Sequence, residues 1–188
     1  MDLTEDVRGR LADAQRRLRS AGGKVRWTQP ENLHVTLKFL GDVPDKLAGQ
    51  VCRAAEEVAG SVERFAFDVR GVTAVPPRGA LRMFWAGVND PAGGMAALVA
   101  GLDEAMQPLG FAPERRAFRP HVTLGRVKSG RDVDALRAAA EEWADAAFGE
   151  GEAGVVTVYS SELTPDGPVY APLARPALSK GGRPPGRR

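Results

Sequence analysis

Apolar residues recur every three or four positions in four stretches of the chain, the spacing that is typical of amphipathic helices. In the first stretch Val7, Leu11, Ala14 and Leu18 form the apolar stripe, and Thr4 precedes it as the expected N-cap residue. Glycine and proline residues interrupt the pattern between the stretches. The helices predicted in this way cover residues 4–20, 44–59, 95 to about 108, and 133–147.

Shorter segments alternate apolar and polar residues, as half-buried strands do. Phe65, Phe67 and Val69 show this alternation most clearly. Loops rich in Gly, Pro, Asn and Asp separate the segments. The predicted strands are residues 25–27, 33–40, 64–69, 81–88, 118–126, 155–163 and 169–173, with turns at 29–32 and 164–167. The chain is therefore expected to mix helices and strands throughout.

The chain contains two histidines, and each begins the same four residues, His-Val-Thr-Leu. Positions i and i+2 of a strand face the same side, so His34 and Thr36 would share one surface, as would His121 and Thr123. Each copy is followed by a predicted helix and a later pair of strands. This matched order indicates a duplicated lobe with a cleft between the halves, and two such strands facing each other would form a phosphate-sized site.

Length and composition fit one ordinary globular domain, since 43% of the 188 residues are hydrophobic. We predict a single bilobal domain over residues 1–179. Residues 180–188 form a basic tail that we expect to be disordered, because it contains four basic residues and no acidic one. The formal net charge is only +2, so any contact with a polynucleotide has to be local.

Cysteine usage and the N-terminus both favour the cytoplasm. Cys52 is the single cysteine, which excludes an intramolecular disulfide and a thiolate-rich metal site. It lies in a helical pattern, where a small buried residue is expected rather than a nucleophile. The first residues lack the basic and apolar regions of a signal peptide, and no stretch is long enough to span a membrane. We therefore expect a cytoplasmic protein that acts as a monomer.

Two histidines on opposite sides of one phosphate could hydrolyse a 2′,3′-cyclic phosphodiester without a metal ion. One would take a proton from water and the other would protonate the departing ribose oxygen, and an ordinary pKa near 6.5 allows both states. Thr36 and Thr123 could donate hydrogen bonds to the non-bridging oxygens. The residues alone do not assign the acid and the base, since the two halves are nearly equivalent.

Much of the chain also resembles a known family. The segments that carry the resemblance are residues 26–41, 84–88, 118–126 and 161–170. They look like the bacterial and archaeal RNA 2′,3′-cyclic phosphodiesterases, also called 2′-5′ RNA ligases, of the 2H phosphoesterase superfamily. The resemblance implies a bilobal α+β fold, in which two antiparallel sheets backed by helices surround a central cleft with pseudo-two-fold symmetry.

The resemblance also implies an activity and roles for the histidines. The expected reaction hydrolyses RNA 2′,3′-cyclic phosphate ends, or cyclic nucleotides, to 2′-phosphomonoesters, with no cofactor and no metal. His34 would be the proton donor to the leaving 3′ oxygen, and His121 the proton acceptor that activates water. Arg126 matches an arginine common in the family motif and would neutralise phosphate charge.

Strand parity opposes that role for Arg126. Positions 121, 123 and 125 share a face, so residue 126 points away unless the strand bulges or ends there. Lys38 and Arg119 are each an even number of positions from the histidine of their motif, so a strand would place their side chains on the same face as that histidine, where they could contact phosphate.

Three aromatic residues, Trp27, Trp85 and Phe39, could stack on an RNA base. Core packing is the preferred interpretation for Trp85, which lies in an apolar segment, and for Phe39, whose parity is opposite to that of His34.

The N-terminus departs from the family pattern. Family members usually open with a short apolar strand ahead of the first helix, whereas this chain reaches the helix at Thr4. We therefore expect a missing strand and an unpaired sheet edge, which costs stability and invites association.

Several other functions stay open at this point. The same site could join RNA ends through a 2′-5′ linkage, act on small cyclic nucleotides, or bind nucleotides without catalysis. A binding module has no chemical need for both histidines. A metal site built on the two histidines is disfavoured, because neither has a carboxylate or a cysteine at ligand spacing.

Overall fold

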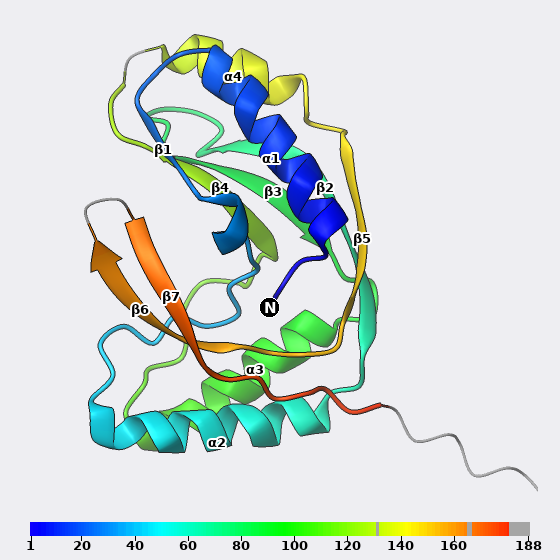
Figure 1. Cartoon of the computed structure of the whole chain (residues 1–188), viewed down its shortest axis with the longest axis vertical. Helices are drawn as coiled ribbons and strands as arrows, with labels where there is room; N and C mark the ends of the chain where they lie inside the picture. Colours follow the sequence, from blue (N-terminus) through cyan, green and yellow to red (C-terminus); the bar gives the residue numbers. More distant parts are fainter. Residues whose placement is uncertain (131, 165–166, 181–188) are drawn as a thin grey trace, which may run out of the picture.

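The computed structural model describes residues 1–130, 132–164 and 167–180. Within them the chain forms four α-helices, a five-stranded antiparallel sheet and a two-stranded antiparallel sheet (Figure 1). The helices are α1 (Glu5–Ser20), α2 (Asp45–Ser61), α3 (Gly94–Met106) and α4 (Val133–Glu141), with 3₁₀ helices η1 (Pro30–Asn32) and η2 (Gln107–Leu109). The strands are β1 (Val25–Trp27), β2 (Phe65–Val75), β3 (Met83–Asn89), β4 (His121–Val127), β5 (Ala147–Ala153), β6 (Val158–Thr164) and β7 (Gly167–Ala174). The predicted α+β class with two antiparallel sheets is confirmed.

The helices form two pairs at opposite ends of the molecule, α1 with α4 and α2 with α3 (Figure 1). The predicted apolar stripe of α1 is completely buried, and the Thr4 hydroxyl accepts a hydrogen bond from the Val7 N–H at 3.4 Å, as its N-cap role requires. Both helix pairs contribute to one continuous hydrophobic core. The two helix pairs therefore pack on the same core.

The strands of the larger sheet are ordered β1-β4-β3-β2-β5, so the second histidine motif, at the start of β4, lies inside the sheet. Across β4, Trp27 of β1 stacks on the buried Phe84 of β3 with ring centroids 5.7 Å apart. Gly125 makes this contact possible, because a Cβ atom there would lie 2.8 Å from Cε3 of Trp27. Trp27 is thus engaged in packing across the sheet.

One predicted helix is too long, and the sequence pattern misses β5. The alanine-rich segment predicts a helix to residue 147, whereas α4 ends at Glu141 and β5 begins at Ala147. The chain leaves the helix because the carbonyls of Trp143 and Ala146 accept hydrogen bonds from N–H groups of β2, at 2.9 and 2.8 Å. β5 is rich in glycine, which masks its alternation. β2 continues to Val75, whereas the predicted strand ends at residue 69. The other predicted elements occur with bounds shifted by up to three residues, apart from residues 33–40.

The strand predicted for residues 33–40 is wrong. Only isolated bridges form there, at His34 and Val35, after the short helix η1 interrupts the extended chain that starts as β1. The interruption follows from Pro30, which cannot donate a ladder hydrogen bond and favours a turn. The first motif nevertheless keeps strand-like alternation, since Leu33 and Val35 are buried and His34 and Thr36 are not.

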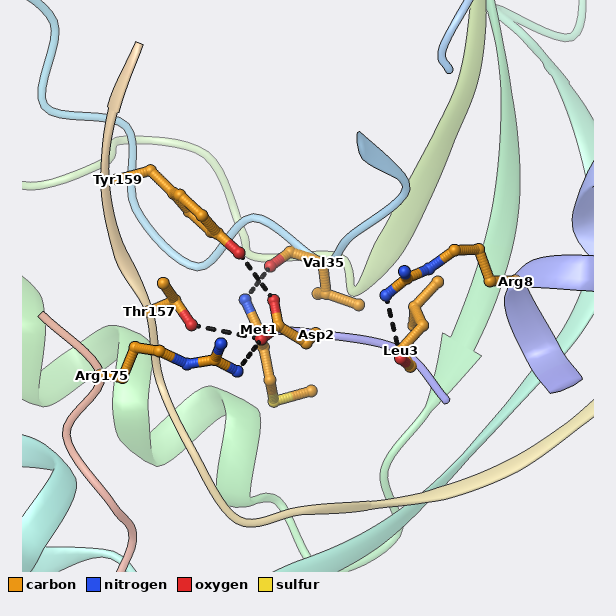
Figure 2. A network of polar contacts seen from close by, with 8 residues as sticks. All are labelled: Met1, Asp2, Leu3, Arg8, Val35, Thr157, Tyr159 and Arg175. Atoms are coloured by element: carbon orange, nitrogen blue, oxygen red, sulfur yellow. Dashed lines mark hydrogen bonds and ion pairs between the residues drawn. The ribbon is translucent and has the colours of Figure 1, made fainter. Parts of the chain in front are cut away.

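Residues 1–3 cover the sheet edge that the sequence predicts to be unpaired. Met1 exchanges two backbone hydrogen bonds with Val35, at 2.8 and 3.0 Å, and Asp2 bridges His34. The Asp2 carboxylate then accepts hydrogen bonds from Tyr159 at 2.9 Å and from Arg175 at 2.9 Å, which come from β6 and the segment after β7 (Figure 2). This network joins the two-stranded sheet to the first motif.

Two sequence predictions fall wholly or partly outside the described residues: the middle of the turn at 164–167 and the basic tail beyond Lys180. No helix among the described residues is long and apolar enough to cross a membrane.

Candidate active site

The two His-Val-Thr-Leu copies lie side by side, because Val35 forms an antiparallel bridge with Val122 of β4. Both valines are fully buried. Bridge partners point to the same side of a sheet, and the residues that flank them point to the other side. The four motif side chains therefore share the face opposite the core, which we call the histidine face: His34, Thr36, His121 and Thr123.

The bridge gives this site an approximate two-fold symmetry. In an antiparallel pair centred on Val35 and Val122, His34 lies opposite Thr123, and Thr36 lies opposite His121. The two imidazoles therefore occupy diagonal corners, separated by the spacing of neighbouring strands, about 4.8 Å, and a shift along them. A group bound between them would be flanked by one histidine on each side.

Both imidazoles are held in the same way by the main chain. Nδ1 of His34 lies 2.7 Å from the carbonyl oxygen of Asn32, and Nδ1 of His121 lies 2.7 Å from that of Arg119. A carbonyl only accepts hydrogen bonds, so Nδ1 carries the proton in each neutral ring. Nε2 is then the nitrogen that can take up or release a proton. Nothing in the sequence indicates these hydrogen bonds, although each acceptor carbonyl belongs to the residue two positions before its histidine.

The environment lowers the pKa of both histidines from 6.5. For His34 the main cause is burial, which the hydrogen bond to the Asn32 carbonyl opposes. The positive charge of the Met1 amino group lowers the pKa of His34 further, and the Asp2 carboxylate raises it by a smaller amount. For His121 the main cause is again burial, and the positive charge of Arg126 lowers its pKa further. A nearby positive charge thus lowers the pKa of each histidine, the Met1 amino group at His34 and the Arg126 guanidinium at His121, and a carboxylate partly offsets this effect at His34 only.

The two threonines differ in their surroundings. Thr36 is exposed, and its hydroxyl lies 3.0 Å from Nε2 of His34. Thr123 is half-buried, and its carbonyl accepts a hydrogen bond from the Thr28 hydroxyl at 2.8 Å. The edge of β4 is thereby held in place beside the site.

Arg126 lies on the histidine face because β4 bulges. The register pairs Thr123 with Trp85 but Gly125 with Phe84, so β4 has one extra residue between these pairs. Arg126 is then opposite Met83, which shares its face with Trp85. The bulge is the exception that the parity argument allowed for, and it puts the Arg126 side chain on the side of His121.

Aromatic rings flank both histidines, and sequence reasoning misses this role. Trp85 stacks on His121 with ring centroids 3.9 Å apart and an interplanar angle of 23°, so it is not only a core residue. Tyr170 meets His34 edge-on at 5.4 Å, and Tyr159 lies 6.3 Å away. The pairing of β3 with β4 would predict the contact between Trp85 and the site, because Trp85 lies directly opposite Thr123.

Two side-chain assignments made from parity need correction. Lys38 does not face the site: its side chain is 7% exposed, forms an ion pair with Asp103 of α3, and donates to the Ala112 carbonyl at 3.0 Å. Phe39 is not a core residue, because it is 85% exposed. Both errors arise because the chain after Thr36 is not a strand, so strict alternation does not apply. Arg119 is exposed, and its carbonyl rather than its side chain has the contact with His121.

No group of three or more His, Cys, Asp and Glu side chains among the described residues could hold a metal ion. The side chains of the histidine face and Arg126 can provide proton transfer by two imidazoles, hydrogen bonding by two hydroxyls, and one guanidinium charge.

Comparison with known proteins gives consistent matches over most of the chain. A family model described as LigT like Phosphoesterase matches residues 1–85 and 87–170. The chain is 35% identical over 173 residues to an RNA 2′,3′-cyclic phosphodiesterase of Methanothermobacter thermautotrophicus, covering 92% of this chain and 93% of that protein. It is 31% identical over 175 residues to a protein of the same name from Aeropyrum pernix, covering 93% and 98%.

Among solved structures, the crystal structure of TT0787 of Thermus thermophilus superposes with a TM-score of 0.80 at 29% sequence identity. The superposition covers 96% of this chain and 96% of that one. The shared fold thus extends over almost the full length of both chains.

Proposed function

This chain belongs to the LigT-like phosphoesterase family, and we infer that it is an RNA 2′,3′-cyclic phosphodiesterase, as its relatives from two archaea are named. One observation supports this activity most directly. The two histidines of the twin motifs flank a single bridge, and each has its Nδ1 bound to a carbonyl two residues earlier. Two proton-transferring Nε2 atoms on one face are what hydrolysis of a cyclic phosphodiester needs.

In the reaction that we propose, Nε2 of neutral His121 takes a proton from water as the water oxygen attacks phosphorus. The bond between phosphorus and the 3′ oxygen breaks, and protonated His34 gives its Nε2 proton to that oxygen. The product carries a 2′-phosphomonoester and a free 3′ hydroxyl. Each proton transfer of this kind typically contributes about 10²- to 10⁴-fold to the rate.

A neighbouring charge supports the assignment of His121 as the base, whereas the assignment of His34 as the acid rests on the resemblance to the family. At His34 the Asp2 carboxylate favours the charged form, which a proton donor needs, but the positive charge of the Met1 amino group has the larger and opposite effect. The guanidinium of Arg126 favours the neutral form of His121, which a proton acceptor needs. A bound phosphate, being anionic, would raise the pKa of both rings.

Thr36, Thr123 and Arg126 are proposed to bind the phosphate. The hydroxyl groups would donate to the non-bridging oxygens, where negative charge grows in the transition state, and Arg126 would neutralise that charge. We further propose that the enzyme needs no metal ion, acts as a monomer and works in the cytoplasm, since its one cysteine, Cys52, suits a reducing compartment.

The test is product analysis on an oligoribonucleotide that ends in a 2′,3′-cyclic phosphate, with and without a chelator. We expect a 2′-phosphate end and full activity in the chelator. His34→Asn and His121→Asn are informative variants, because the asparagine amide can still donate to the carbonyl while the titrating nitrogen is lost. Each should lower the rate by about 10²-fold or more. Full activity in either variant, with an unchanged unfolding temperature, would contradict the two-histidine mechanism.

Two alternatives give different results in the same assay. A nucleotide-binding module would bind nucleoside monophosphates without hydrolysing the cyclic phosphate of an oligonucleotide or of a mononucleotide. A 2′-5′ ligase would join a cyclic phosphate end to a 5′ hydroxyl end: the 5′ oxygen attacks phosphorus in place of water, and the 3′ oxygen leaves and takes up a proton. Comparing an oligonucleotide with a cyclic mononucleotide distinguishes a preference for RNA from one for small nucleotides.

A further inference from the structure

A row of cationic side chains continues the histidine face along the edge formed by β1 and β4. Beyond the bulge, Arg26 of β1 lies directly opposite Arg126 of β4, and Val25 lies opposite Val127. The ladder extends one pair further, because the N–H of Lys128 donates to the carbonyl of Lys24 at 2.7 Å. The row therefore consists of two opposed pairs: Arg26 with Arg126, and Lys24 with Lys128.

Strand parity puts both pairs on the side of the histidines. Trp27 and Val25 point into the core, where both would contact a Cβ atom at Gly125. The residues that alternate with them, Arg26 and Lys24, point to the opposite side, which is the histidine face. All four cationic residues of the row are exposed.

Ion pairing among the described residues does not explain the row. Six other basic side chains form ion pairs with carboxylates, but among the described residues none of the four in the row does. Arg26 makes one long contact, in which its Nη2 lies 3.5 Å from the Thr164 carbonyl. Like charges placed directly opposite on neighbouring strands are destabilising. Two such pairs in sequence weaken the sheet edge and serve the fold in no visible way.

The geometry matches an extended nucleic acid strand. Residues two apart on a strand are about 6.6 Å apart, so the row offers cationic pairs at steps comparable to the spacing of successive phosphates. The row begins beside Arg126 and leads away from His121. Since the whole protein carries a net charge of only +2, a polyanion depends on local groups of basic residues such as this row.

We propose that Lys24, Arg26 and Lys128, together with Arg126, bind the phosphodiester groups of the nucleotides that precede the cyclic phosphate. This inference rests on the proposed function and specifies its substrate: the enzyme favours the ends of RNA chains over cyclic mononucleotides. A cyclic mononucleotide reaches only the histidine motifs and Arg126, because it has no preceding phosphate.

The experiment compares two substrates, cytidine 2′,3′-cyclic phosphate and a trinucleotide with a 2′,3′-cyclic phosphate end. The variant is Lys24→Gln with Lys128→Gln. The matched control is Lys46→Gln with Arg53→Gln, which removes the same charge from two exposed positions on α2. The kcat/KM of each protein is measured over a series of salt concentrations. Binding of a fluorescein-labelled trinucleotide with a 3′-phosphate end is measured by anisotropy as a readout that needs no turnover.

We expect the wild type and the control to prefer the trinucleotide, and the Lys24 and Lys128 variant to lose about 5- to 10-fold of that preference. Its salt dependence should become shallower by about 0.7 in log–log slope for each phosphate group that the variant no longer binds. The rate on the mononucleotide should stay near that of the wild type.

Three results would overturn the proposal: an unchanged preference in the variant, an equal loss in the control, or an equal fall on both substrates. If the wild type hydrolyses neither substrate, the proposed function fails. The anisotropy measurement then tests separately whether the row binds phosphodiester groups. An unchanged affinity in the variant would reject that binding.

Discussion

Replacing Lys38 by methionine distinguishes a structural role from a role in phosphate binding. The Lys38 ammonium is paired with Asp103 of α3 and donates to the Ala112 carbonyl, and its side chain is only 7% exposed. Removal of one partner of a buried ion pair costs about 3–5 kcal/mol, because the other charge is left without compensation. Asp103 is 18% exposed and still accepts from the Glu114 N–H, so the lower end of that range, about 3 kcal/mol, is expected.

A loss of about 3 kcal/mol should lower the unfolding temperature by about 6–12 °C for a chain of this length. The double variant, Lys38→Met with Asp103→Leu, removes both charges and should recover a large part of that loss. Differential scanning calorimetry measures the stability of both variants. The kcat/KM for a cyclic mononucleotide is measured below their unfolding temperatures, and we expect it to remain close to the wild-type value.

A phosphate contact would give a different pattern. If Lys38 bound the substrate, kcat/KM would fall at least about tenfold in both variants, and the Asp103 substitution would not restore it. That result, or a single variant as stable as the wild type, would refute the structural role.

Three further outcomes are expected. Trp85→Leu removes the ring stacked on His121 and should lower kcat about tenfold, in line with the roughly 1–2 kcal/mol of stacking on a cation, while Trp85→Phe should retain part of the rate. Arg126→Gln removes a charge that lowers the pKa of His121, so that pKa should rise and the acidic limb of the kcat/KM profile should move to higher pH; an unshifted limb would mean that another group is the base. Gly125→Ala introduces a Cβ atom 2.8 Å from Trp27 and should reduce the free energy of unfolding by about 1–3 kcal/mol in urea titrations, whereas no loss would show that Trp27 can move aside.

Periodicity predicts the elements whose burial is local and regular. The stripe of α1 is completely buried, and the two identical tetrapeptides lie side by side, as their repetition predicts. Periodicity fails where a distant partner decides the conformation. β5 exists because carbonyls after α4 bind β2, and its glycines carry no pattern of their own.

The same distinction applies to the site residues: some are evident from the local sequence, and others depend on a distant partner. His34 and His121 are visible in the sequence because identical tetrapeptides surround them. Arg126 depends on a bulge, which is set by the pairing of β4 with β3 and leaves no mark in the local sequence. Phe39 and Lys38 are misassigned because the strand-like alternation of the first motif does not continue past its last paired residue.

The hydrogen bonds from Nδ1 of each histidine to a main-chain carbonyl have a consequence for how this enzyme can change. The acceptors belong to Asn32 and Arg119, yet no substitution at either residue deletes a carbonyl oxygen. The tautomer of both rings is thus protected against point mutation as long as the local backbone path is kept. Variation during evolution, or in a mutant library, can act on the neighbours that tune proton affinity while the proton-carrying nitrogen stays the same.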